Sequence, residues 1–369
     1  MLEILDFFAA DVLLSIFFFV IGLELVDEFR NGELRDIKHA SLPALAAMGG
    51  VLIPALIYFG IIFISDVSPV FEHGWAIPTA TDVAFSLAVI DIVATRARKK
   101  GCFNVRAGTK LFLMVLAVAD DIIGIVIIAV AFSSGINAFF LLMLVFVLGI
   151  WVYLVRSLNF HNWWSWALVC IVAVCAWLCV YFAGIHPTIA GVLLGILVPA
   201  KRQDIIEDDV NRPVSRARFW ARKLTPFSNK IVVPIFAVIS LAVSGYELYY
   251  GFSSGSEILS SDVAWIIPMA VTLALVFGKP LGILLFAWIG QHLTPLQLFH
   301  RLRVRNLIGT SMLGGIGFTV SFLIAGLSFE GIQDGATITA IARLGVVLGS
   351  IISAILGYFV IRLETKRIR

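Results

Sequence analysis

Apolar stretches about as long as a membrane is thick alternate with short polar connections along the whole chain. A helix needs about 20 apolar residues to cross a hydrocarbon core of about 30 Å, so each stretch is a candidate membrane span. The eleven candidates cover residues 9–29, 41–64, 76–95, 111–132, 137–155, 163–183, 186–200, 231–250, 263–289, 306–328 and 337–361. This pattern predicts an all-α polytopic membrane protein with a single transmembrane domain over residues 1–369.

The positive charges predict how these spans are oriented. All but two of the 27 Lys and Arg residues fall on alternate connections, near 30–40, 96–110, 156–162, 201–230, 290–305 and the C-terminal tail. Cytoplasmic connections carry the excess of Lys and Arg, so the C-terminus is predicted to be cytoplasmic and the N-terminus outside. The longest basic connection, 201–230, is expected to face anionic lipid headgroups.

The composition excludes other classes of protein. Only 14% of the residues are charged and 60% are hydrophobic, whereas a soluble domain has about 25% charged residues. No long charged tail indicates a nucleic-acid partner. The four cysteines suggest neither a disulfide framework nor a metal site.

Two adjacent carboxylates, Asp120 and Asp121, stand at the centre of the otherwise apolar span 111–132. An Asp near the bilayer midplane costs about 2.5–3.5 kcal/mol even on lenient insertion scales. Neighbouring residues of a helix point about 100° apart, so one partner cannot satisfy both side chains in the same way. The pair indicates an ion or proton site; the alternative is a structural role in contacts between helices.

The third span is interrupted near its start. Pro78 removes a helical hydrogen bond, and Thr81 and Asp82 follow within about one turn. A broken helix at membrane depth is tolerated where it lines a cavity, and its freed carbonyls can bind cations. Asp82 would then compensate the dipoles of the half-helices. The alternative is that Asp82 only caps the helix that follows it.

Lys279 lies deep in the ninth span, between Gly278 and Pro280. A lysine can extend to the membrane surface only from near a helix end, so a salt bridge to an intramembrane Asp is expected. Burial also makes a lysine a candidate proton carrier.

Spans two to four and nine to eleven form two matching triplets, at about 41–133 and 263–361. Each has an interrupted middle span, at 78–82 and 314–319, and the two triplets start on opposite sides of the membrane. Interrupted segments at corresponding positions of inverted repeats predict a substrate site between them.

Five sequence strings together resemble the NhaA-type sodium/proton antiporters of bacterial inner membranes. They are GWAIPTATDVAFSLAV, KLFLMVLAVADDIIG, FGKPLGI, GIHPTIAGV and GGIGFTVSFLIA, and the resemblance runs from about residue 11 to the C-terminus. NhaA is itself a known example of the inverted-repeat architecture. The resemblance therefore implies an NhaA-like fold with two interrupted helices crossing near the midplane.

The resemblance also implies roles for the charged residues. Asp120 and Asp121 match the cation and proton site, with Asp121 as the more central ligand for Na⁺. Asp82 and Lys279 match residues that balance the half-helix dipoles, Lys279 is expected to pair with Asp120, and Thr81 supports the site.

The chain also departs from the family pattern. Family members usually begin with another span and an extracellular β-hairpin used for dimer contact, whereas this chain starts at what resembles the second span. A homodimer would then lack that contact.

Glu24 and His186 are candidates for a pH response, against the alternative of ordinary interfacial residues. Asp11 is expected to be a solvated interfacial carboxylate. Val26 and Asp27 stand where the family has basic residues, which favours a different pH threshold or none.

The function that these observations predict is export of Na⁺, and of Li⁺, in exchange for inward H⁺. Adjacent acids in a low-dielectric cavity cannot easily both be charged, so protons and Na⁺ compete for them while the site opens to alternate sides. Such electrogenic, pH-dependent exchange would serve pH homeostasis and salt tolerance, without a cofactor and without an enzymatic reaction. The alternatives are a sodium-coupled symporter of a small organic solute and an inactive truncated homologue. An intramembrane aspartyl protease is disfavoured because Thr81 and Ala119 precede the acids where Tyr or Gly would be required.

Overall fold

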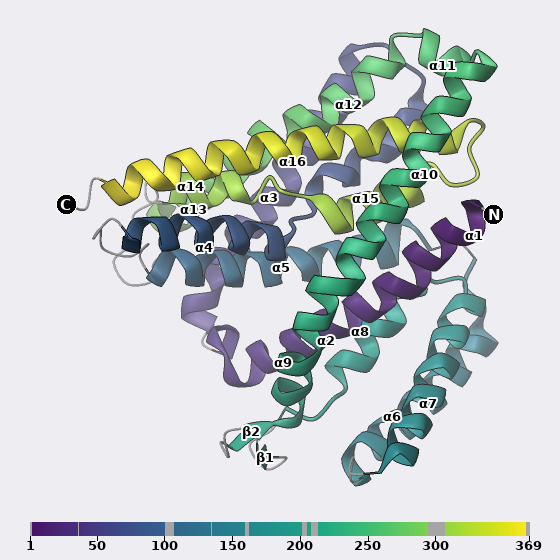
Figure 1. The fold of residues 1–369 in the computed structure, drawn as a ribbon, viewed down its shortest axis with the longest axis vertical. Coiled ribbons are helices and arrows are strands. Elements are labelled where there is room, and N and C mark those ends of the chain that lie inside the picture. The colour runs from purple at the N-terminus through teal and green to yellow at the C-terminus, as the bar shows by residue number, and fades with distance from the viewer. Residues whose placement is uncertain are drawn as a thin grey trace. The chain divides into compact units, whose positions relative to one another are not determined.

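The computed structural model describes residues 2–35, 37–99, 107–133, 135–158, 162–200, 205–207, 213–293 and 307–366. Helices make up almost all of this part of the chain (Figure 1). Its contacts divide the chain into two compact units, unit 1 with residues 1–35 and 125–240, and unit 2 with residues 36–124 and 241–369. The all-α prediction is confirmed, apart from one short antiparallel hairpin.

Unit 1 contains the N-terminal helices and the middle of the chain. Its helices are α1 (Leu2–Phe7), η1 (Phe8–Leu13), α2 (Leu14–Asn31), η2 (Glu33–Arg35), α6 (Ala138–Ser157), α7 (Trp163–Phe182), α8 (Thr188–Ile196), α9 (Arg216–Phe227) and η4 (Ser228–Val232). The hairpin of β1 (Ile205–Glu207) and β2 (Pro213–Ser215) leads into α9, and the hydroxyl of Ser215 caps this helix by accepting a hydrogen bond from the Arg218 N–H.

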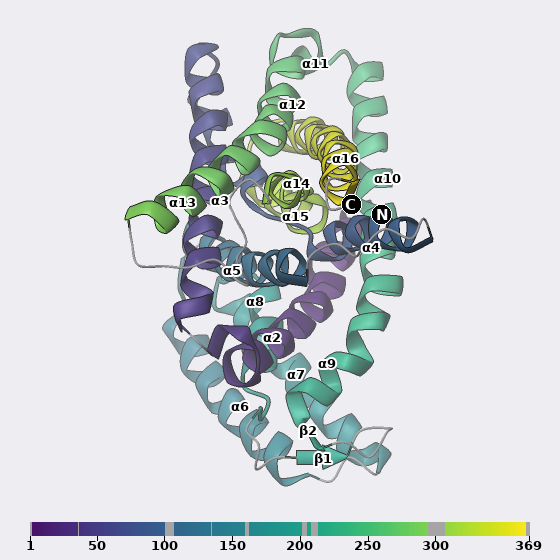
Figure 2. The ribbon, with the colours of Figure 1, turned by 90° about the vertical axis from the view of Figure 1, so that its left-hand side faces the viewer.

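Unit 2 contains both interrupted spans. Its elements are α3 (Ile37–Ile64), η3 (Pro69–Thr79), α4 (Val83–Lys99), α11 (Glu257–Ser260), α12 (Val263–Leu273), η5 (Ala274–Gly278), α13 (Lys279–Leu293), α14 (Ile308–Leu313), α15 (Phe318–Ser328) and α16 (Gly335–Lys366). Helices α5 (Ala107–Ala131) and α10 (Val233–Ser254) each have one part in either unit. The view in Figure 2 shows α14 and α15 beside the long helix α16.

Every predicted span coincides with helix, although not always with one continuous helix. Eight helices among the described residues are long and apolar enough to cross a membrane, and the bent pair η3 and α4 makes a ninth. The other two predicted spans are α8, which has nine residues between Pro187 and Pro199, and the separate pieces α14 and α15. Proline cannot continue a helix with normal hydrogen bonds, which accounts for the short α8. The count of eleven spans therefore stays a prediction.

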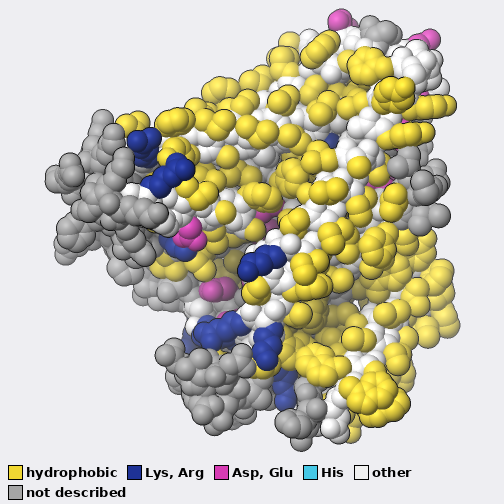
Figure 3. All heavy atoms as spheres, in the orientation of Figure 1, with side chains coloured by type: hydrophobic (Ala, Val, Ile, Leu, Met, Phe, Trp, Pro, Cys, Tyr) yellow, Lys and Arg dark blue, Asp and Glu magenta, His cyan; other side chains and the backbone are white. Residues whose placement is uncertain are grey.

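The exposed side chains are those expected of a protein in lipid. Phe63, Val130, Phe146 and Trp265 each keep at least 70% of their surface exposed. Hydrophobic side chains cover most of the face drawn in Figure 3. Together with the long apolar helices, this surface identifies a multi-pass membrane protein.

Close packing of α3 and α13 fixes the helix that carries Lys279. A methyl group added at Gly282 would overlap the backbone of Gly49, and one added at Gly49 would overlap the carbonyl of Gly282. Small residues let transmembrane helices approach to backbone contact. Here this contact lies one turn after Lys279.

Candidate ion-binding site

The two interrupted helices of unit 2 meet at their breaks. The Asp82 N–H donates to the carbonyl of Ile316 over 2.6 Å, and the hydroxyl of Thr81 donates to the carbonyl of Gly314 over 2.9 Å. Ser86 adds a hydrogen bond of 2.8 Å to the carbonyl of Leu313. Backbone groups at the breaks thus find partners in the interior, one in the other break and two in side-chain hydroxyls, as a membrane requires.

Asp82 binds to the beginnings of two helices at once. Its Oδ2 accepts the hydroxyl of Thr319 at 2.9 Å and the Thr319 N–H at 3.4 Å, in the first turn of α15. Its Oδ1 accepts the Phe85 N–H at 3.3 Å, in the first turn of α4. A carboxylate at a helix N-terminus satisfies free N–H groups and faces the positive end of the helix dipole. Asp82 thus has the geometry of a cap for both helices, and its role as a dipole partner stays a prediction.

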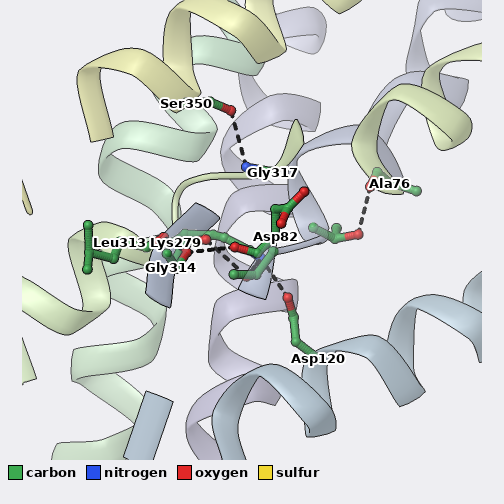
Figure 4. Close-up of polar contacts among 11 residues, drawn as sticks. Ala76, Asp82, Asp120, Lys279, Leu313, Gly314, Gly317 and Ser350 are labelled. Atoms are coloured by element: carbon green, nitrogen blue, oxygen red, sulfur yellow. Dashed lines mark hydrogen bonds and ion pairs between the residues drawn. The ribbon is translucent and has the colours of Figure 1, made fainter. Parts of the chain in front are cut away.

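Lys279 forms the ion pair expected of it. Its Nζ lies 2.8 Å from Oδ2 of Asp120, and the two side chains are 1% and 3% exposed. The ammonium also donates a hydrogen bond to the hydroxyl of Thr81, which itself binds the last turn of α14 through Gly314. Figure 4 shows this cluster of side chains at the two breaks. A positive charge is thereby held close to the carbonyl end of α14.

Asp121 follows Asp120 on α5 and differs from it in exposure. Asp120 is buried with its residue 4% exposed, whereas Asp121 is partly exposed. The two adjacent carboxylates thus have unequal surroundings, with one held by a cation in the protein interior. Carboxylate, hydroxyl and carbonyl oxygens are the ligands that hard cations prefer, and all three kinds lie at this place.

The two candidates for a pH response lie in unit 1 and in different clusters. Glu24 of α2 accepts a hydrogen bond of 2.6 Å from the hydroxyl of Thr225 on α9. His186 lies 2.8 Å from the hydroxyl of Thr188 and 3.4 Å from the carboxylate of Asp11. The expectation of a solvated Asp11 is wrong, because its side chain is only 15% exposed and faces this histidine.

Thr319, Ser86 and Arg343 hold the site or its helices, and the sequence did not assign them a role. Thr319 and Ser86 are ordinary hydroxyl residues in apolar helices, so only the fold shows that they bind the breaks. Arg343 was visible as an intramembrane charge, which is by itself a signal of function.

Of the basic connection 201–230, positions 201–204 and 208–212 lie outside the described residues.

A multi-pass membrane protein with two broken helices that meet at charged side chains belongs to the class of secondary transporters. The family described as "Na+/H+ antiporter 1" matches residues 2–361, and the chain belongs to this family. It is 38% identical to the Na(+)/H(+) antiporter NhaA of Bifidobacterium longum, over 97% of this chain and 73% of that protein. It is 39% identical to that of Bifidobacterium adolescentis, over 97% and 75%, and 34% identical to that of Pasteurella multocida, over 94% and 83%.

Members of this family are Na⁺/H⁺ antiporters, and therefore transporters rather than enzymes. They move Na⁺ and H⁺ across the membrane and use no cofactor.

Proposed function

We propose that this protein exports Na⁺, and also Li⁺, in electrogenic exchange for inward H⁺ at a site built on Asp120 and Asp121. The observation that carries the proposal is the buried pair of Lys279 and Asp120 beside two helix breaks. A charged pair inside a membrane protein is costly and typically marks an ion or proton pathway. The membership of the chain in the antiporter family supports the same assignment.

Exchange follows from competition for the same oxygens. The carboxylates of Asp120 and Asp121 can hold protons or can coordinate Na⁺, with the Thr81 hydroxyl nearby as a further ligand. The Lys279 ammonium already occupies one oxygen of Asp120, so Na⁺ at that carboxylate must compete with it. Protons and Na⁺ then exclude each other, and a site that opens to one side at a time exchanges them.

Asp82 and Lys279 keep the site intact through the transport cycle. Asp82 faces the N–H groups that begin α4 and α15, and Lys279 acts through Thr81 on the carbonyl end of α14. The partial charges at these three helix ends, which would repel or attract ions on their own, are thereby compensated. The inverted repeats at about 41–133 and 263–361 supply the two broken helices and would move against their surroundings to give alternating access.

The location that we propose is the bacterial inner membrane, with the C-terminus in the cytoplasm and the N-terminus outside. The distribution of Lys and Arg over alternate connections supports this orientation. Uptake of protons from outside would then drive the removal of Na⁺ from the cell, which links the protein to salt tolerance and pH homeostasis.

The test is dye-monitored exchange in proteoliposomes that hold the purified protein. An acid-inside proton gradient is set up, NaCl is added over a series of pH values, and collapse of the gradient is followed with a pH-sensitive fluorophore. We expect Na⁺ and Li⁺ to collapse the gradient with the wild type but not with the double variant Asp120→Asn, Asp121→Asn. Exchange that survives in this variant would overturn the site; absence of any cation effect in the wild type would favour a symporter or an inactive chain.

A further inference from the structure

Helix α16 is long and unbroken, and it packs against both α14 and α15, the two pieces of the second broken span. Thr339, Arg343 and Ser350 of α16 occupy positions that fall within about 40° of one another around a helix of 3.6 residues per turn. Each of the three contacts α15 or the break before it. The hydroxyl of Thr339 donates to the carbonyl of Ala325 at 3.3 Å, and the hydroxyl of Ser350 accepts the Gly317 N–H at 3.2 Å (Figure 4).

Arg343 makes the central contact of this row. Its Nε donates to the carbonyl of Phe322 over 3.4 Å, and its guanidinium lies 5.9 Å from the centre of the Phe322 ring. Its Nη1 lies 3.4 Å from the hydroxyl of Ser244 on α10, so that one side chain joins three helices. The residue is only 3% exposed, although a guanidinium is a permanent cation that is expensive to bury in a membrane protein.

The position of α15 matters because its first turn binds Asp82. Phe322 lies three residues after Thr319, whose hydroxyl and N–H both meet the Asp82 carboxylate. The opposite side of α16 is held by close packing on α12, since a methyl group added at Gly345 would overlap the backbone of Pro268. The hydroxyl of Thr272 adds one hydrogen bond of 3.0 Å to the carbonyl of Gly345. Helix α16 therefore links α15 to α12, the helix that leads through η5 to Lys279.

We propose that Arg343 is a positioning residue of the cation site, which holds the half-helix α15 so that Thr319 meets the carboxylate of Asp82. This inference rests on the proposed function of the site. Arg343 does not contact the cation; it acts on Na⁺ binding through α15 and Asp82. Outer residues that orient the groups around a metal ion typically change its affinity by about 10–100-fold when they are removed.

The test measures the Na⁺ concentration at half-maximal exchange and the maximal rate, in proteoliposomes at fixed pH. We expect Arg343→Gln to raise the half-saturating Na⁺ concentration about tenfold and to leave the maximal rate within about twofold of the wild type. Arg343→Lys keeps the cation but reaches fewer acceptors, so it should recover part of the loss. The matched control is Thr272→Val, which removes a hydrogen bond from the other side of α16 and should leave Na⁺ affinity unchanged.

A double variant shows whether Arg343 acts through Thr319. Thr319→Val should raise the half-saturating Na⁺ concentration about tenfold by itself. Adding Arg343→Gln should raise this concentration little further, because both changes disturb the same contact. Two effects that multiply would overturn the inference, as would an Arg343→Gln protein that loses thermal stability but keeps wild-type affinity.

If Arg343→Gln does not fold, Gly326→Ala provides the test. The added methyl would lie 3.3 Å from Nη2 of Arg343 and displace the guanidinium slightly. The half-saturating Na⁺ concentration should therefore rise, as in Arg343→Gln, and an unchanged value would overturn the inference.

The double Asn variant of Asp120 and Asp121 separates the two proposals. If it still exchanges Na⁺ for H⁺, the proposed site fails; if it is inactive while the Arg343 and Gly326 variants bind Na⁺ normally, only the role of Arg343 fails.

Discussion

The ion pair of Lys279 and Asp120 is buried almost completely, with side chains 1% and 3% exposed. Loss of the ammonium in Lys279→Met would leave the Asp120 carboxylate in the interior without its cation. Removal of one partner from a buried ion pair typically costs about 3–5 kcal/mol, and both side chains here are nearly inaccessible. We expect a fall of that size in the free energy of unfolding, measured by thermal or denaturant unfolding in detergent.

The control for this prediction is the double variant Lys279→Met, Asp120→Asn, in which neither charge remains. It should recover part of the lost stability, although it is not expected to transport Na⁺. Purely additive losses in the double-mutant cycle would show that the two side chains do not stabilise each other in the folded protein.

A second ion pair, in unit 1, allows a stability change that leaves the proposed site untouched. Asp27 accepts hydrogen bonds from Arg218 at 2.7 Å, from Asn31 at 2.8 Å and from Ser215 at 3.2 Å, and so fastens α2 to the start of α9. Because Arg218 is about one third exposed, Asp27→Ala should cost about 1–2 kcal/mol, less than a fully buried pair. Unfolding measurements check this loss of stability. The half-saturating Na⁺ concentration should stay at the wild-type value, and a large change in it would show that the α2–α9 contact controls transport.

At the scale of elements, the contact of α3 with α13 should be intolerant of even one methyl group. Gly282→Ala would drive α13 away from the backbone of Gly49, and α13 begins with Lys279. Overpacking typically costs about 1–3 kcal/mol, so both thermal stability and exchange rate should fall. Gly60→Ala on α3, the helix that carries Gly49, is the control, since nothing lies within 4 Å of the added methyl. Equal behaviour of the two variants would contradict the close contact.

The elements also show what the sequence could and could not predict. Long apolar stretches identify helices directly, and Asp82, Asp120 and Lys279 stand out because a charge inside such a stretch is rare. The partners of these charges are less visible. Thr319 and the carbonyls of Leu313, Gly314 and Ile316 become partners only when the two breaks meet, and that depends on the tertiary fold.

At the scale of the whole molecule, the proposed site lies within one of the two units. Unit 2 contains almost all of both predicted repeats, 41–133 and 263–361, as well as Thr81, Asp82, Asp120, Asp121 and Lys279. Glu24 and His186 belong to unit 1. A pH response through either of them would therefore have to change unit 2 from outside, whereas competition between H⁺ and Na⁺ at the carboxylates needs no residue beyond unit 2.

The charge that the whole molecule moves per cycle decides whether voltage drives it. If more H⁺ enters than Na⁺ leaves, one net charge crosses the membrane, and each charge is worth about 2.3 kcal/mol per 100 mV. A potassium diffusion potential of about 100 mV is set with valinomycin in proteoliposomes. It should shift the steady-state ratio of internal to external Na⁺ about 40-fold, because about 1.4 kcal/mol corresponds to a factor of ten. The shift is read from ²²Na⁺ distribution, with the Asp120→Asn, Asp121→Asn protein as the leak control. A ratio that follows the pH gradient alone, whatever the potential, would mean electroneutral exchange: one proton per Na⁺, and a site in which only one of the two carboxylates changes its proton.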